Sequence, residues 1–472
     1  MPSLSIASRA GGTATLSAEA LASFRQGLRG ELLLQGDPGY DQARAVWNAM
    51  IDRRPAAIVR CAGAADVMRC VALAREEGLL LSVRGAGHNI AGKAVSDGGL
   101  MVDLSRLRGV SVDPRRRTAR VGAGATLADL DHETQAFGLA TPVGINSTTG
   151  IAGLTLGGGF GWLSRKHGLT VDNLLSATVV TAAGELVTAS AKQNADLFWG
   201  VRGGGGNLGI VTEFEFRLHK VGPEVLSGLI VHPFADADRV LRHYRAFVAG
   251  APEDVTCYVV LRKAPPLPFL PPAVHGTEVV IIAVLTTAGL RKGKQLLKPL
   301  REFGKPIADV VGPHPFTGWQ RAFDPLLTPG ARNYWRSHNF RELSDAALDT
   351  IRAYASRLPS GQSEILVAQL GGAINAQAPD ATAYPHRDAN FVMNVHTRWE
   401  DKSRDQARVA WAREFSDRTA PFATGGVYVN FVSEGEERVR AAYGGNYARL
   451  AELKRAYDPT NLFSLNQNVP PA

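Results

Sequence analysis

The sequence SVRGAGHN, at residues 82–89, decides how the first half of the chain must fold. It ends an apolar run at residues 79–83, which follows a short β-rich segment at residues 57–60 and a helical pattern at residues 65–77. Apolar periodicity that changes from strand to helix and back to strand is typical of a βαβ unit. We therefore expect residues 82–89 to form a glycine-rich loop at the end of a strand, where the backbone can approach a ligand closely.

Glycine is unusually frequent, with 50 residues in a chain of 472, against a typical share of about 7%. Residues 87–94 have the spacing of a Walker A loop, but Ala94 occupies the position of the hydroxyl that must bind Mg²⁺. Residues 204–209 match GxGxxG, yet residues 210–216 alternate like a strand where the dinucleotide fingerprint requires a helix. The sequence argues against a P-loop ATPase and against a Rossmann NAD site.

Four glycine-rich segments remain, at residues 84–89, 148–150, 157–161 and 209–211. Each one alone is more consistent with a tight turn than with a binding site. Several such loops together can instead lie against one long anionic ligand, because glycine lets backbone amides approach a pyrophosphate. Both interpretations stay open at the level of the loops themselves.

Composition excludes several classes of protein. Hydrophobic residues make up 45% and charged residues 20%, which is typical of a soluble globular protein. The net charge of +8 includes only one compact basic run, residues 115–117, so we expect no nucleic-acid partner. The three cysteines have no metal-like spacing, and we predict no metal site. We see no signal peptide and no membrane span, and we expect a cytoplasmic monomer or homodimer.

The glycine segments and their order resemble the FAD-linked oxidases of the vanillyl-alcohol oxidase or PCMH-type superfamily. Within it, the sequence is similar to berberine bridge enzyme-like proteins, near the bacterial 6-hydroxy-D-nicotine oxidase-type members. The resemblance covers nearly the whole chain, although residues 225–380 match only in general shape. The matching segments are residues 82–89, 153–162, 166–173, 199–203, 207–212, 428–431, 458–461 and 465–468.

This resemblance implies an α+β fold. Its PCMH-type FAD-binding domain consists of two α/β subdomains, and a substrate domain built on an antiparallel sheet covered by helices is inserted into it. We expect residues 1–220 and 415–472 to form the FAD-binding domain and residues 221–414 to form the substrate-binding domain. The composition also changes after Lys220, and the proline-rich connection at residues 265–272 cannot lie inside a central strand.

The resemblance also implies FAD as the cofactor, bonded covalently through its 8α carbon to His88. A neutral imidazole nitrogen is a plausible nucleophile for such a bond. Some relatives have a second bond from a cysteine, but this chain has Asn146 at that position, so we expect a single attachment. The other residues expected at the cofactor are Arg84, Gly85, Ala86, Gly87, Asn89, Gly144, Asn146, Thr149, Gly150, Gly153, Gly158, Gly209, Val211 and Asn466.

Two pairs of side chains are the catalytic candidates. The period of a strand would place Tyr428 and Asn430 on one face, where the phenol could accept a proton if its pKa were lowered. A second predicted strand, at residues 391–396, places Asn394 and His396 on one face. Plant relatives have an acidic base in this region, and residues 390–398 contain no Asp or Glu, so that base is absent or replaced. His396 is either an alternative proton acceptor or a structural histidine.

The expected reaction is two-electron oxidation of a C–O or C–N bond in a small organic substrate. The substrate would be an alcohol, a cyclic amine, a sugar or a natural-product intermediate, and O₂ would reoxidise the flavin to give H₂O₂. Two alternatives stay open: a flavin dehydrogenase with another electron acceptor, and a flavin-binding cyclase without net redox turnover.

Overall fold

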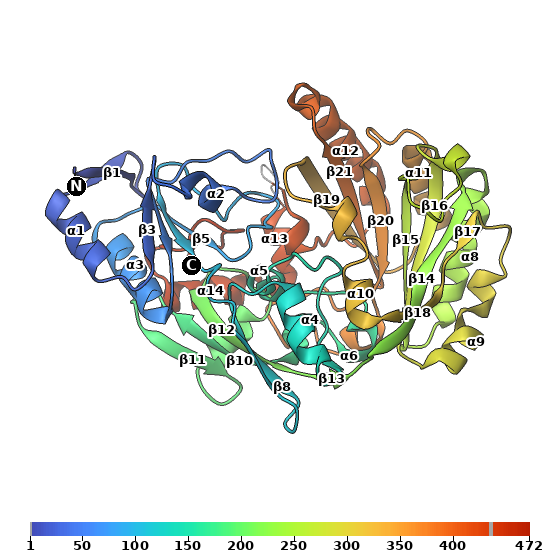
Figure 1. Ribbon diagram of the computed structural model, residues 1–472, viewed down its shortest axis with the longest axis horizontal. Helices are drawn as coiled ribbons and strands as arrows, with labels where there is room; N and C mark the ends of the chain where they lie inside the picture. The colour runs from blue at the N-terminus through green and yellow to red at the C-terminus, as the bar shows by residue number, and fades with distance from the viewer. Residues whose placement is uncertain (1, 434–437) are drawn as a thin grey trace.

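The computed structural model describes residues 2–433 and 438–472. Near the N-terminus lies a four-stranded sheet in the order β3-β4-β6-β5 (Figure 1). β6 pairs in parallel with both β4 and β5, and helix α3 connects β4 to β5, which confirms the predicted βαβ unit. The SVRGAGHN segment contains the last residues of β5 and the loop that follows its carboxyl end. The elements are β1 (Leu4–Ala7), β2 (Thr13–Leu16), α1 (Ala18–Gln26), β3 (Glu31–Leu34), α2 (Tyr40–Arg44), β4 (Ala57–Arg60), α3 (Ala64–Glu76), β5 (Leu81–Arg84) and β6 (Leu100–Asp103).

A second, antiparallel sheet has the order β11-β10-β12-β8-β7. The segment that matches GxGxxG runs directly into strand β12, as its alternating sequence predicts. One hydrophobic core joins this sheet to the first, with Val59, Val102, Val121 and Phe214 all fully buried in it. The elements are β7 (Val110–Asp113), β8 (Thr118–Gly122), α4 (Leu127–Gln135), α5 (Ile151–Leu156), α6 (Ser164–His167), β10 (Leu174–Val180), β11 (Leu186–Ser190), α7 (Ala195–Val201) and β12 (Ile210–Arg217).

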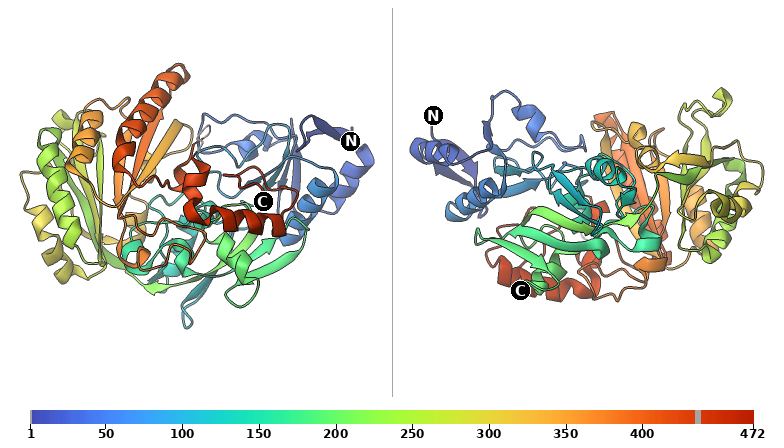
Figure 2. Two further views of the ribbon diagram at one scale, coloured as in Figure 1. Left: turned by 180° about the vertical axis from the view of Figure 1, so that it is seen from behind. Right: turned by 60° about the horizontal axis from the view of Figure 1, so that its bottom comes forward.

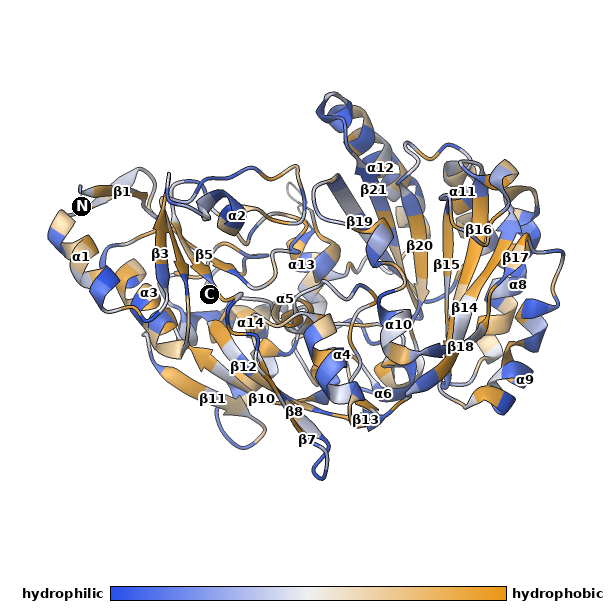
Figure 3. Ribbon diagram, viewed as in Figure 1, coloured by the Kyte–Doolittle hydropathy of each residue, from blue (hydrophilic) through white to orange (hydrophobic). Residues whose placement is uncertain are grey.

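The middle of the chain forms an eight-stranded antiparallel sheet in the order β17-β14-β16-β15-β20-β21-β19, with β18 pairing with β14. Helices pack on one face around a second core. Strands β16 and β20 are largely apolar, whereas β19 is mostly hydrophilic (Figure 3). The elements are β14 (Glu224–Pro233), α8 (Ala237–Gly250), β15 (Val255–Lys263), β16 (Glu278–Thr286), α9 (Leu290–Arg301), β17 (Ala308–Asp309), β18 (Gly312–Pro315), α10 (Phe316–Gln320), β19 (Arg332–Phe340), α11 (Asp345–Ala355), β20 (Glu364–Gln369), β21 (Phe391–Trp399) and α12 (Asp405–Thr419).

The other face of the large sheet packs against the first half of the chain. A third core combines strand residues such as Tyr258 and Val392 with Phe160, Trp162 and Tyr428. Because both of its faces are covered, β16 is almost continuously apolar and buried. This junction between the large sheet and the glycine-rich loops is where the candidate site lies.

The C-terminal segment returns to the first half of the molecule, where α13 (Val439–Tyr443) and α14 (Tyr447–Tyr457) lie (Figure 2). Lys454 and Asp458 form an ion pair of 2.6 Å, and both side chains are 0% exposed. The Lys454 ammonium also donates to the carbonyls of Asn207, at 2.8 Å, and Phe463, at 3.0 Å. These contacts attach the end of the chain to the loop before β12.

The α+β architecture with a large antiparallel sheet is as predicted. One expected strand is wrong: residues 429–431 form a short 3₁₀ helix (Val429–Phe431), although Tyr and Val favour strands. Tertiary contacts override that preference, because the amide of Tyr428 donates to Ser337 Oγ and the amide of Phe431 turns back to the Tyr428 carbonyl. The domain boundaries stay a prediction; the large sheet begins at Glu224, and α12 ends at Thr419.

Candidate functional site

A cavity lies between the glycine-rich loops and the large sheet. Its walls come from residues 85–89, 144–157, 205–211 and 463–467 at one end, and from β19, β20, β21 and residues 428–431 at the other. Segments far apart in the sequence therefore meet at one site. The predicted residues that line it are Gly85, Ala86, Gly87, His88, Asn89, Gly144, Asn146, Thr149, Gly150, Gly153, Gly209, Val211, Asn394, His396, Tyr428, Asn430 and Asn466.

Two predicted cofactor residues do not line this cavity. The Arg84 guanidinium donates to the carbonyl of Ala43, and its Nε lies against Gly87, where an added Cβ would be 3.2 Å away. Gly158 faces a neighbouring aromatic residue, since a Cβ there would lie 2.8 Å from Cδ2 of Tyr384. Neither residue lines the cavity, and a role for either one at the cofactor stays a prediction.

The loop at residues 85–89 presents unused backbone donors. Within residues 2–433 and 438–472, none of its five amides donates a hydrogen bond to another protein group. Gly87 has a φ of +75°, a conformation that L side chains rarely adopt. Successive free amides in such a turn form an anion-binding concavity. Lys93, whose side chain also lines the cavity, adds a positive charge that the sequence analysis missed.

Two further features of the cavity wall leave room and a hydrogen-bond acceptor for a ligand. A Cβ added at Gly153 would meet nothing within 4 Å, so this wall is open toward the cavity. The Oδ1 atom of Asn466 is buried without a hydrogen-bond partner in the described chain. A free-amide loop, an open glycine wall and an unpartnered amide oxygen fit the pyrophosphate and ring portions of FAD.

His88 stands at the edge of the free-amide loop. Its ring stacks on Trp47 with a centroid distance of 5.3 Å and an interplanar angle of 23°. Its Nε2 lies 3.0 Å from Oγ1 of Thr148. Burial lowers the pKa of His88 from 6.5 to about 4, so the imidazole is neutral at physiological pH. A neutral ring retains one lone pair on nitrogen, as nucleophilic attachment requires.

Asn146 forms a local network with Thr148. Its Oδ1 accepts from the backbone amide of Thr148 at 3.0 Å and from its hydroxyl at 2.6 Å. All three cysteines, Cys61, Cys70 and Cys257, are buried outside the cavity lining.

Tyr428 lies at the far end of the cavity, with its hydroxyl oxygen held by two donors. The amide of Gly159 donates to it at 3.1 Å, and Nδ2 of Asn430 donates at 3.0 Å. Burial raises the pKa of Tyr428 to about 12, and these two hydrogen bonds only partly oppose that effect. The lowered pKa on which the predicted proton-acceptor role depends is therefore not found. The resting phenol is protonated, and its own hydrogen is available to a ligand.

Tyr428 and Asn430 do meet, although the strand that was expected to bring them together is absent. The 3₁₀ turn joins them by a direct hydrogen bond between the amide and the hydroxyl. A Cβ on Gly157 would lie 2.3 Å from Oδ1 of Asn430, so only glycine leaves room for that side chain.

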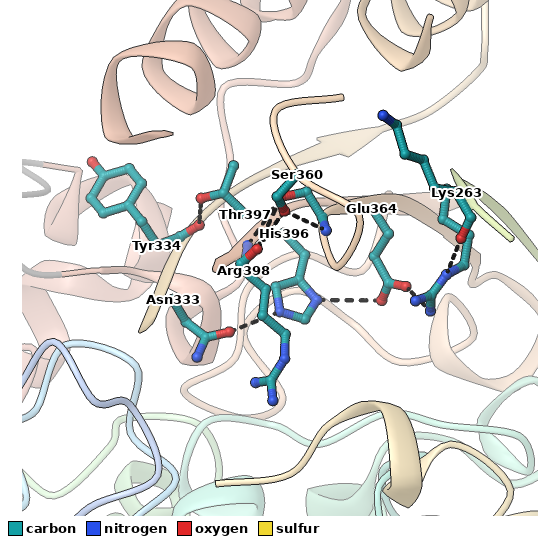
Figure 4. A network of polar contacts seen from close by, with 10 residues as sticks. Lys263, Asn333, Tyr334, Ser360, Glu364, His396, Thr397 and Arg398 are labelled. Atoms are coloured by element: carbon teal, nitrogen blue, oxygen red, sulfur yellow. Dashed lines mark hydrogen bonds and ion pairs between the residues drawn. The ribbon is translucent and has the colours of Figure 1, made fainter. Parts of the chain in front are cut away.

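Asn394 and His396 lie on strand β21, as predicted, and both face the cavity. A carboxylate that the sequence analysis missed lies beside them: Glu364, directly opposite His396 on the adjacent strand β20. Its Oε1 is 3.3 Å from Nδ1 of His396, while Nε2 of His396 is 3.1 Å from Oδ1 of Asn333 (Figure 4). The acid is absent from residues 390–398 because the neighbouring strand β20 supplies it.

The charges around Glu364 fix its protonation state. Burial acts to raise the pKa of Glu364, but the charge of the Arg262 guanidinium at 2.8 Å is the largest opposing effect, and the pKa is lowered to about 2. Burial lowers the pKa of His396, although Glu364 acts in the opposite direction. An ionised carboxylate and a neutral imidazole therefore stand together in the cavity wall.

Within residues 2–433 and 438–472, no group of three or more His, Cys, Asp or Glu side chains is arranged to hold a metal ion. No helix in the same residues is long and apolar enough to cross a membrane.

The chain matches known families along its length. The FAD binding domain family matches residues 55–190, and the berberine and berberine-like family matches residues 427–470. The uncharacterized FAD-linked oxidoreductase YgaK of Bacillus subtilis is 32% identical, over 94% of this chain and 97% of YgaK. (R)-6-hydroxynicotine oxidase of Paenarthrobacter nicotinovorans is 30% identical, over 94% of this chain and 97% of that protein.

A solved structure agrees with these matches. BBE-like 1 of Physcomitrella patens superimposes with a TM-score of 0.86 at 25% identity, covering 96% of this chain and 99% of that chain. The free-amide loop and the open glycine wall lie where a FAD-binding family is matched. The chain belongs to the berberine bridge enzyme-like, PCMH-type family of FAD-linked oxidoreductases.

Proposed function

We propose that the protein is an oxidase that removes two electrons from a C–O or C–N bond of a small organic substrate and passes them through FAD to O₂, giving H₂O₂. The observation that carries this proposal is one cavity lined both by the free amides of residues 85–89 and by Glu364, His396 and Tyr428. FAD supplies the two-electron acceptor chemistry when bound.

The cofactor end would hold FAD through residues of the glycine-rich loops. The amides of residues 85–89, with Lys93, would bind the pyrophosphate. Gly153 leaves room for the cofactor, and His88 would bond covalently to its 8α carbon. Asn146 in place of a cysteine supports attachment at one point.

The substrate end has mostly aromatic and aliphatic walls. Trp47, Phe160, Trp335, Leu366 and Phe431 line it, and several of these rings contact one another edge to face. Such walls favour a substrate with a flat or apolar portion. They also exclude water from the reacting bond, which strengthens the few polar contacts that remain.

The polar residues of this end suggest how a substrate proton is taken. Asn333 donates through Nδ2 to the carbonyl of Ala331 at 2.8 Å, so its Oδ1 faces His396 and requires a proton on Nε2. Neutral His396 then has an unprotonated Nδ1 facing the ionised Glu364. Nδ1 of His396 and the Glu364 carboxylate are then both hydrogen-bond acceptors, and no proton lies between them.

A proton from the substrate hydroxyl or amine would complete the contact, because an imidazolium can donate to the carboxylate at this position. Glu364 alone, with a pKa of about 2, would be a weak base. His396 would accept the substrate proton and share it with the Glu364 carboxylate, so the pair would be a stronger base than the carboxylate alone. Tyr428 would donate its free hydrogen to the substrate and orient the bond that loses hydride.

Spectroscopy of the purified protein tests this proposal. The protein should be yellow, and a panel of alcohols, cyclic amines, sugars and phenolic intermediates, mixed anaerobically, should contain a compound that bleaches the flavin absorbance. Air should then restore the colour within the turnover time and release one H₂O₂ per substrate. Slow recovery in air would point to a dehydrogenase, and full flavin occupancy without bleaching would refute the redox role.

A further inference from the structure

The environment of His88 contains a short hydrogen-bond chain with a defined direction. Nε2 of His88 donates to the Thr148 hydroxyl, the hydroxyl donates to Oδ1 of Asn146, and the same oxygen also accepts from the backbone amide of Thr148. The distances are 3.0 Å from the amide to Oδ1, 2.6 Å from the hydroxyl to Oδ1, and 3.0 Å from the hydroxyl to Nε2 of His88.

The backbone amide sets the direction of the whole chain. An amide can only donate, so the Asn146 atom that receives it must be the carbonyl oxygen and not the NH₂ group. That oxygen cannot donate, so the Thr148 hydroxyl must give its single hydrogen to Asn146. The hydroxyl oxygen can then only accept from His88. The proton of the neutral ring is thereby fixed on Nε2, and Nδ1 carries the lone pair.

We propose that Thr148 and Asn146 are positioning residues for flavin attachment, and that they hold His88 with its proton on Nε2 so that Nδ1 forms the bond to FAD. This inference rests on the proposed covalent attachment at His88. Within the described residues, Nδ1 has no hydrogen-bond partner that would compete for its lone pair. Trp47, stacked on the ring, holds its plane.

Covalent attachment forms one C–N bond and breaks one C–H and one N–H bond. Nδ1 of His88 forms a bond to the 8α carbon, which loses one proton. The electron pair from that C–H bond passes into the flavin ring, and the Nε2 proton leaves the alkylated imidazole. The flavin takes up two protons with the two electrons, and O₂ then accepts both electrons and protons to give H₂O₂.

The test measures covalent incorporation and not turnover. Wild type, Thr148→Val, Thr148→Ser, Asn146→Ala and the surface control Thr350→Val are produced in a riboflavin-starved host and mixed with FAD. Acid-precipitated samples taken over time report the covalent fraction through flavin fluorescence in denaturing gels. Proteolysis and NMR of the flavin peptide then identify the bonded nitrogen. Fluorescence quenching on mixing reports non-covalent binding separately.

Thr148→Val should bind FAD as wild type does but incorporate it about tenfold more slowly, the effect of losing one hydrogen bond. Its linkage should divide between Nδ1 and Nε2. Asn146→Ala frees the Thr148 hydroxyl to donate to His88, so its linkage should move toward Nε2. Thr148→Ser and Thr350→Val should match wild type.

Wild-type rates and a pure Nδ1 linkage in both Thr148→Val and Asn146→Ala would overturn the positioning role while leaving the attachment intact. A wild-type protein that binds FAD with no covalent fraction would instead overturn the attachment at His88, and the positioning role with it.

Discussion

Replacing Glu364 by Gln removes a charge from the cavity wall while keeping the length and shape of the side chain. In the wild type the carboxylate lies 3.3 Å from Nδ1 of His396 and 2.8 Å from Nη1 of Arg262. The amide cannot stabilise a proton on His396 as the carboxylate does, so the pair loses its ability to take the substrate proton. The aromatic walls that bind the substrate are unchanged.

The proposed role of Glu364 in proton transfer sets how much Glu364→Gln should slow flavin reduction. General base catalysis contributes about 10²–10⁴-fold to a rate, and Glu364→Gln leaves the imidazole in place. We therefore expect flavin reduction to slow about 100-fold, which corresponds to about 2.7 kcal/mol in the activation free energy. The dissociation constant of the substrate should change by less than about threefold, since uniform binding is not altered.

Anaerobic stopped-flow bleaching of the flavin, over a range of substrate concentrations, gives the reduction rate and the dissociation constant separately. Glu400→Gln is the matched control, because it makes the same charge change outside this cavity. A Glu364→Gln variant that is reduced as fast as wild type and Glu400→Gln would refute the proton-accepting pair.

Four further outcomes are expected. In a pH series, the wild-type reduction rate should be constant near neutral pH and fall only below the pKa of His396, because protonated His396 cannot accept a proton. Burial keeps that pKa under 6.5, and Glu364→Gln should move the fall in rate to lower pH. Tyr428→Phe should slow reduction about tenfold through the lost donor, as stopped flow would reveal. Asp458→Asn leaves the fully buried Lys454 charge unpaired and should cost about 3 kcal/mol in urea unfolding, unlike exposed Asp417→Asn. Gly153→Leu should fold normally but exclude FAD, measured as flavin content and melting temperature, because its side chain enters the open cavity.

The residues of the site that the sequence predicts lie in contiguous segments of the chain. The loop at residues 82–89 follows a strand, and local glycine chemistry determines its backbone, so its position in the cavity could be anticipated. His396 and Asn394 were likewise found from the period of one strand.

Contacts between distant segments could not be found in this way. Glu364 and His396 are 32 residues apart and meet only through the register of β20 with β21. Tyr428 and Asn430 were paired on the assumption of a strand, and a turn set by Ser337 brings them together instead. The raised pKa of Tyr428 depends on burial by the third core, which no local pattern encodes.

Covalent attachment at His88 is tested by mass spectrometry of the proteolytic peptide that contains this residue. We expect this peptide from wild-type protein to carry the mass of FAD, and His88→Ala to yield the unmodified peptide with all flavin released by acid. A wild-type His88 peptide without flavin, from protein that is otherwise intact and supplied with FAD, would contradict this attachment.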